Sequence, residues 1–239
     1  MIPLTLEIAT KVRDTVDAGL CNGVGNPVPG EMCVEAAVCF AYGLPHGDNP
    51  PCVGVAVRAG KITLNDANWS SNAARAKGMR KIAVAQLGSD NIDQAEYAKR
   101  LALKTIQKIV PLALRAAAGM KGNEAHREKL NAAASACEST VELSSASDAA
   151  RDAASCAARA ASDAARYAAS AASAASDAAS YAARDASYAA SCAARAASDA
   201  SDAASDAARD EVLTKAANVQ LSVLIELKSP GCEFLHLVN

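Results

Sequence analysis

The chain has 239 residues, a net charge of −2, and 51% hydrophobic but only 3% aromatic residues. This length excludes an assembly of more than one or two domains, and the near-neutral charge excludes a general attraction of the whole chain to nucleic acid. No apolar window of about 18 residues predicts a membrane span, and the first residues lack the pattern of a signal peptide. We therefore expect a cytoplasmic protein whose eight cysteines are reduced.

Residues 1–122 predict a small helical globular module. Its first helix is indicated by apolar residues at four-residue steps, namely Ile8, Val12 and Val16. Pro29 precedes a second helix over residues 31–42, and the loop 43–51 follows because proline and glycine exclude regular structure there. Residues 52–57 are short and apolar, and they fit either a helical turn or a strand.

Two further helices complete this module. Ser71 or Asn72 can cap the first of them. The second spans residues 92–109, and Pro111 ends or kinks it before the helix continues. Trp69, the single tryptophan, is expected to anchor its loop to the core rather than to stack on a ligand.

Residues 72–121 hold ten Lys or Arg and three acids, which gives 10 − 3 = +7. A basic stripe of this kind can bind the phosphates of a nucleic acid. A solvated helix face is the simpler interpretation, so we rank nucleic-acid binding as an unlikely alternative.

Residues 123–211 predict an alanine-rich helical repeat, either as one rod or as a few packed helices. Neither glycine nor proline occurs between Gly122 and Pro230, and alanine has the lowest helical cost of any residue. Alanine recurs every 11 residues, which is 3.67 per helical turn and places a methyl stripe along one face. We expect this stripe to pack on itself or on a partner through Ala149, Ala153, Ala160, Ala164, Ala171, Ala182, Ala193 and Ala204.

Asp and Arg occupy the face opposite the stripe, and Asp206 and Arg209 form one of the expected i,i+3 ion pairs. Residues 212–239 then predict an amphipathic helix and an apolar tail. The buried face of this helix is expected to contain Leu213, Ala217, Leu221 and Leu224. The segment should dock on the N-terminal module or on a second copy of the chain.

The densest group of chemically reactive side chains comprises Cys33, Glu35, Cys39, His46, Asp48 and Cys52. In a first interpretation Cys33 is a nucleophile in the first turn of a helix, whose dipole lowers the thiol pKa. His46 would then act as a base and Asp48 would orient it. This arrangement would make the protein an enzyme.

A second interpretation is a zinc site formed by His46, Asp48 and some of the cysteines. The spacing Cys-x5-Cys-x12-Cys fits no standard zinc site. The third interpretation, which we favour, is structural: the cysteines are small core residues, Glu35 faces solvent and Asp48 caps a turn. We therefore expect no metal and no cofactor.

Two runs of the chain, PGEMCVEAAVC at 29–39 and GLPHGDNPPCV at 43–53, are followed by Leu-Asn-Asp at 64–66. Together they resemble a module of bacterial and phage proteins that also carry an alanine-rich repeat. That family often has Trp where this repeat has Tyr, Cys or Ser. The resemblance implies a two-part layout and a bacterial or phage origin, and it implies no particular activity.

The repeat is also similar to alanine-rich helical antifreeze proteins, which use the same eleven-residue spacing. Those proteins mostly show a threonine row on the ice face, whereas residues 146–208 contain no threonine. Ice binding is therefore a weaker alternative. The hypothesis we favour is a non-enzymatic helical structural or interaction protein that packs on another protein or on itself, the latter including a homo-oligomer, and that binds no membrane.

Overall fold

The computed structural model describes residues 3–119, 126–141 and 206–239. Within these ranges the protein forms eight α-helices and no β-strand, and Gly25 and Met32 make one isolated bridge. The predicted all-α class is confirmed. The elements in chain order are α1 (Leu6–Asp17), α2 (Val34–Ala41), α3 (Val55–Asn65), α4 (Asn72–Ala85), the 3₁₀ turn η1 (Ser89–Asn91), α5 (Gln94–Lys108), α6 (Val110–Gly119), α7 (Arg127–Ser139), α11 (Asp206–Glu226) and the 3₁₀ segment η3 (Pro230–Leu237).

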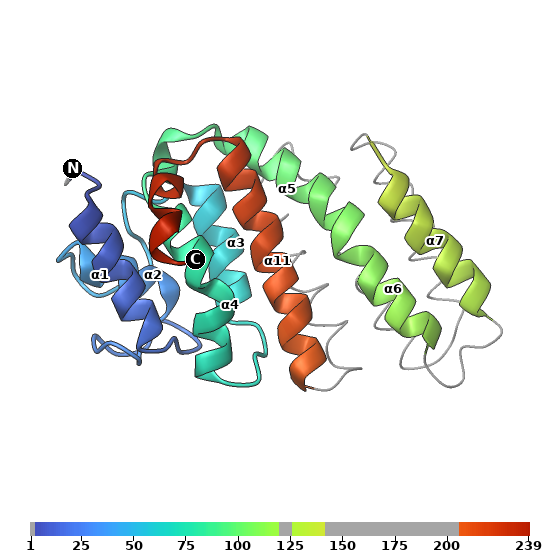
Figure 1. The fold of residues 1–239 in the computed structure, drawn as a ribbon, viewed down its shortest axis with the longest axis horizontal. Coiled ribbons are helices and arrows are strands. Elements are labelled where there is room, and N and C mark those ends of the chain that lie inside the picture. The colour runs from blue at the N-terminus through green and yellow to red at the C-terminus, as the bar shows by residue number, and fades with distance from the viewer. Residues whose placement is uncertain (1–2, 120–125, 142–205) are drawn as a thin grey trace.

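Figure 1 shows α1 and α2 at one end of the molecule and α7 at the other. Between them α4 packs against α1, α2 and α11, and α11 also packs against α3 and α5. The helices α5 and α6 run almost end to end, with the predicted break falling beside Pro111, and α7 packs on both. One hydrophobic core joins residues of α1–α5 to residues of α11 and η3.

Three helices begin at side-chain oxygens that accept hydrogen bonds from the first helical turn. Thr5 does so for α1, Asp93 for α5, and Ser71 for α4. Ser71 was one of the two caps expected from the sequence. These short polar side chains satisfy amide groups that have no partner inside the helix.

Helix α3 was not predicted from the sequence beyond an uncertain apolar turn at 52–57. Its first amides are capped by distant residues: the Gly54 N–H donates to Ser89 Oγ (3.0 Å) and the Ala56 N–H to Gln94 Oε1 (3.1 Å). A Cβ on Gly54 would lie 2.3 Å from the Gln94 side chain. The glycine therefore leaves room for the Gln94 amide at the start of α3. Because the caps come from more than 30 residues away, the local sequence carried little signal for them.

Trp69 anchors its loop to the core, as predicted. It is buried, and its indole N–H donates to the Leu64 carbonyl at 2.9 Å. Its ring lies against Gly78 of α4, where a Cβ would stand only 2.2 Å from the ring and 3.1 Å from the Thr214 hydroxyl. Gly78, in the middle of α4, therefore leaves the space in which the Trp69 indole packs against the helix.

The C-terminal segment docks on the N-terminal helices, which confirms one of the two expected docking modes. The predicted face of α11 is buried at Leu213, Ala217, Leu221 and Leu224. The Ser229 hydroxyl then donates to the Ala85 carbonyl (2.7 Å), and the Gly231 N–H donates to the Leu87 carbonyl (2.7 Å). These bonds satisfy carbonyls at the C-terminal end of α4 that have no helical partner.

Most of the alanine-rich repeat lies outside the described residues, including every alanine expected on its packing stripe: Ala149, Ala153, Ala160, Ala164, Ala171, Ala182, Ala193 and Ala204. Its last six residues, 206–211, belong to the start of α11. There Arg209 and Asp206 form the predicted i,i+3 ion pair at 2.9 Å.

Candidate functional site

The sequence runs that were singled out at 29–39, 43–53 and 64–66 meet around the start of α2. Asn65 accepts a hydrogen bond from the Val34 N–H (3.2 Å) and donates to the Cys21 carbonyl (2.9 Å). Asp66 accepts from the Gly23 N–H at 2.9 Å. The side chains of Asn65 and Asp66 therefore tie the end of α3 to α2 and to the loop before it.

A buried ion pair joins α2 to α3 beside this turn. The Lys61 ammonium donates to Glu35 Oε1, and both side chains are fully buried. The expectation that Glu35 faces solvent is wrong. Seven of the eight residues of α2 are buried, so the helix has almost no exposed face on which a carboxylate could reach water.

Burial disfavours the charged form of both members of this pair. It raises the pKa of Glu35 and lowers the pKa of Lys61, and the attraction between the two charges opposes each shift. The second carboxylate oxygen, Glu35 Oε2, has no hydrogen-bond donor among the described residues. Asp48 lies close enough to raise the Glu35 pKa further, whereas the positive charge of Arg58 lowers it.

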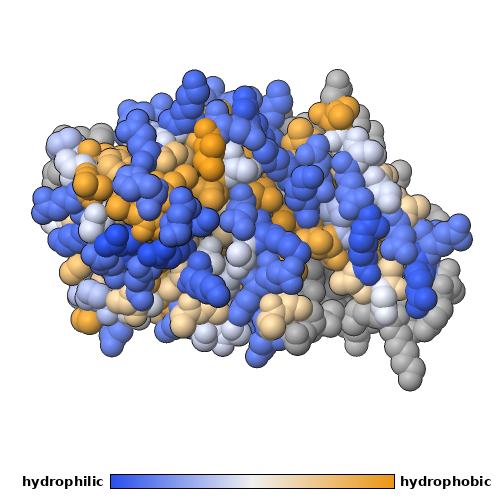
Figure 2. Space-filling model, viewed as in Figure 1, coloured by the Kyte–Doolittle hydropathy of each residue, from blue (hydrophilic) through white to orange (hydrophobic). Residues whose placement is uncertain are grey.

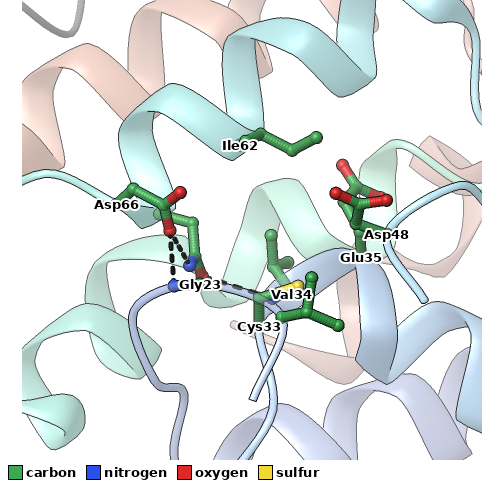
Figure 3. Close-up of a pocket in the computed structure, with 9 residues that line it drawn as sticks. Gly23, Cys33, Val34, Glu35, Asp48, Ile62 and Asp66 are labelled. Carbon is green, nitrogen blue, oxygen red and sulfur yellow. Dashed lines mark hydrogen bonds between the residues drawn. The ribbon is translucent and has the colours of Figure 1, made fainter. Parts of the chain in front are cut away.

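A small cavity of about 60 Å³ adjoins this pair. Figure 3 shows the carboxylates of Glu35 and Asp48 towards one end of it and Asp66 towards the other. Ile62 lies on one side, and Cys33 and Val34 lie opposite. The volume suffices for a few water-sized groups, because one water needs roughly 10–15 Å³.

Cys33 precedes α2 as its N-cap rather than lying in its first turn, and its Sγ accepts a hydrogen bond from the Ala36 N–H at 3.3 Å. Burial raises the pKa of this thiol from 9.0 to about 11, against the smaller lowering effect of hydrogen bonds from the helix backbone. The nucleophile interpretation requires a lowered Cys33 pKa, whereas burial shifts this pKa in the opposite direction and disfavours the ionised form that a nucleophile needs.

His46 lies on the exposed loop, where its Nε2 is 2.9 Å from the Gly25 carbonyl oxygen. In the part of the chain that the structure describes, no hydrogen bond joins His46 to Cys33 or to Asp48, and no group of three or more His, Cys, Asp or Glu side chains is placed to hold a metal ion. Asp48 reaches the cavity and His46 binds the loop backbone, so the predicted arrangement of Cys33, His46 and Asp48 does not assemble.

The remaining cysteines of this cluster are core residues, as the structural interpretation expected. Cys39 and Cys52 are buried, and burial raises the pKa of each. The neighbouring Tyr42 hydroxyl partly offsets the rise in the pKa of Cys52. Cys33, Cys39 and Cys52 are all free thiols.

A larger groove of about 550 Å³ lies between α5–α6 and α11. Its apolar lining comes from Ile109, Leu112 and Val219. Three cations also line it, namely Lys104, Lys108 and Lys215, and none of its lining residues within the described ranges is acidic. Figure 2 shows hydrophobic residues in the strip between α11 and α5–α6, with hydrophilic residues on either side.

The basic stripe predicted over residues 72–121 is partly neutralised by acids from other parts of the chain. The pairs are Arg80 with Asp17, Arg100 with Glu96 and Glu226, Lys104 with Glu226, and Arg115 with Glu138. Arg75 is buried, where it donates to the carbonyls of Asn65 and Leu20. The surface therefore offers less positive charge to a phosphate backbone than the sequence count indicates.

Sequence reasoning named Glu35 but missed Lys61 and the groove between α5–α6 and α11. A signal for the ion pair was present in VEAAVCFA, because a helix that is apolar on all sides leaves a charged residue no exposed position. The groove has no comparable signal, since its two walls are separated by about a hundred residues of sequence.

Within residues 3–119, 126–141 and 206–239, none of the helices combines the length and apolar character needed to span a bilayer. Comparison with known proteins found no family model, no curated protein and no solved structure that matches this chain.

Proposed function

We propose that the protein is a non-enzymatic helical interaction protein that uses its alanine-rich repeat to pack on a second copy of the chain or on another protein. The observation that carries this proposal is the shared core on both sides of the repeat. Residues of α1–α5, which precede the repeat, and of α11 and η3, which follow it, belong to one hydrophobic cluster.

This arrangement places the repeat between two segments that share one hydrophobic core. Helix α7 lies in the first part of the predicted repeat and packs on α6, and α11 contains the last residues of the repeat and packs on α4. Both ends of the repeat are thereby fixed to the same body. A repeat of alanine methyl groups contributes little burial per residue, so it gains most from packing along a long, regular face.

The properties of the Cys33 region support a non-enzymatic role. The thiol is buried with a raised pKa, and His46 binds a loop carbonyl instead of the thiol. Two of the polar side chains around the cavity, Asn65 and Asp66, are engaged in holding α2, α3 and the loop 21–25 together.

The test compares Ala160→Glu, on the predicted alanine stripe, with Ser162→Glu, on the opposite face, in the full chain. A carboxylate on the stripe should dissociate the assembly or lower its melting temperature, because the charge would be buried in an apolar contact. Light scattering and thermal unfolding measure the two effects. Equal behaviour of the two variants would show that the stripe is not a packing face.

A further inference from the structure

The groove between α5–α6 and α11 combines an apolar floor with a rim of one charge sign. Lys104 and Lys108 are one helical turn apart on α5, and Lys215 stands across from them on α11. Lys104 and Lys215 also pair with Glu226 and Glu211 of α11. Lys108 is exposed and has no ion pair within the described residues.

The length of the groove can be calculated from the helical residues that form its two walls. One wall extends from residue 104 to 112 and the other from 215 to 222. At 1.5 Å per residue, each wall is roughly 10–12 Å long, which equals about two turns of an α-helix. An amphipathic helix recognised in a groove of this size presents side chains at positions i, i+3 or i+4, and i+7.

We propose that this groove docks an amphipathic helix of a partner protein whose apolar face is flanked by Asp or Glu. The partner's apolar side chains would contact Ile109, Leu112 and Val219, and its carboxylates would face Lys108 and Lys215. The charge of the partner is assigned by complementarity, because three cations and no acid line the groove among the residues that the structure describes. The lining residues named here do not belong to the predicted repeat 123–211, so the proposal can fail while the proposed function holds.

The probe is a fluorescein-labelled 14-residue peptide with Leu at positions i, i+3, i+4 and i+7 and Glu on both flanks of that face. The control is the same peptide with every Glu replaced by Lys. Fluorescence anisotropy with the full chain at low ionic strength should give at least tenfold tighter binding of the acidic peptide. Salt should weaken that binding, since the rim charges are exposed.

Three variants locate the contact. Lys108→Glu should weaken acidic-peptide binding about five- to tenfold through reversal of one rim charge, and Val219→Glu should weaken it more than tenfold by placing a carboxylate on the floor. Lys99→Glu makes the same charge change on an exposed position of α5 outside the groove and should leave affinity within twofold. Circular dichroism of each variant checks folding.

The proposal is overturned if the two peptides bind equally, or if Lys108→Glu and Lys99→Glu behave alike. It is also overturned if the wild-type chain forms a dimer that Val219→Glu dissociates while the acidic peptide does not bind, because a second copy is then the occupant. Lys108 is exposed, so its variant keeps the test decisive even where Val219→Glu disturbs the fold.

Discussion

The contact between α2 and α3 and the contact between α5 and α11 both contain a Lys–Glu pair, but they place it in different surroundings. Glu35 and Lys61 are fully buried, whereas Glu226 and its partner Lys104 are 40% and 27% exposed. Water screens the second pair and cannot reach the first. The comparison teaches that the burial of an ion pair, more than its geometry, sets what its loss should cost.

The largest effect should come from cutting the buried pair. Glu35→Ala leaves the Lys61 ammonium buried without its partner and should lower the free energy of unfolding by about 3–5 kcal/mol. Urea denaturation measures this. The double variant Glu35→Leu with Lys61→Met removes both charges and should recover most of that loss, so a double variant as unstable as the single one would contradict this account.

The second effect concerns the thiol that caps α2 beside the same pair. Because burial raises the pKa of Cys33 from 9.0 to about 11, its thiolate fraction at pH 8 is lower by about 100-fold, and alkylation should slow at least as much. Iodoacetamide labelling with peptide mapping, compared with the same cysteine in urea-unfolded chain, measures the ratio. Similar rates in the two states would show that the thiol is accessible and ionised.

The same shift predicts how stability depends on pH. The folded state holds the Cys33 proton more tightly than the unfolded state does. The contribution of this proton binding to the free energy of unfolding is therefore complete below about pH 9, and it is lost as the pH rises through about 11. Urea midpoints measured between pH 8 and pH 11 should fall, and Cys33→Ser should reduce the steepness of that fall.

A third effect tests how closely α4 packs against the ring of Trp69. Gly78→Ala normally stabilises a helix by about 1 kcal/mol, but here the new Cβ would stand 2.2 Å from the Trp69 ring. We expect a loss of about 1–3 kcal/mol in the free energy of unfolding. Gly47→Ala, where no atom lies within 4 Å of the new Cβ, is the matched control and should change stability by less than about 0.5 kcal/mol.

The smallest effect should come from Glu226→Gln, which removes ion pairs to Lys104 and Arg100 at the exposed contact. Such pairs contribute less than about 1 kcal/mol, and 1 M salt should reduce the difference between variant and wild type. A loss near that of Glu35→Ala would remove the distinction between the two contacts. Thermal unfolding at two salt concentrations measures it.

The sequence predicted elements whose signals are local. The four-residue spacing of Ile8, Val12 and Val16 located α1, the Ser71 cap located α4, and the apolar face from Leu213 to Leu224 located α11. Each of these signals lies within the helix itself or at its first residue, so no knowledge of the tertiary structure was needed.

Features that depend on distant residues were missed. Helix α3 was missed because its caps, Ser89 and Gln94, come from elsewhere in the chain. Pairing of Glu35 with Lys61 joins residues 26 positions apart, and nothing in either helix alone specifies the other. The candidate site showed the same division: the sequence singled out the run 64–66, but the bonds of Asn65 and Asp66 to α2 and to the loop 21–25 depend on the fold.

The hydrogen bonds from Ser229 and Gly231 to carbonyls at the end of α4 have a consequence for the synthesis of the protein. The Ser229 hydroxyl reaches Ala85 across 144 positions of sequence. A ribosome that has already released α1–α4 must therefore translate well over a hundred further residues before the carbonyls at the end of α4 find their partners. Until then the nascent chain has an incomplete core, and it is during this interval that chaperones and proteases should compete for it most strongly.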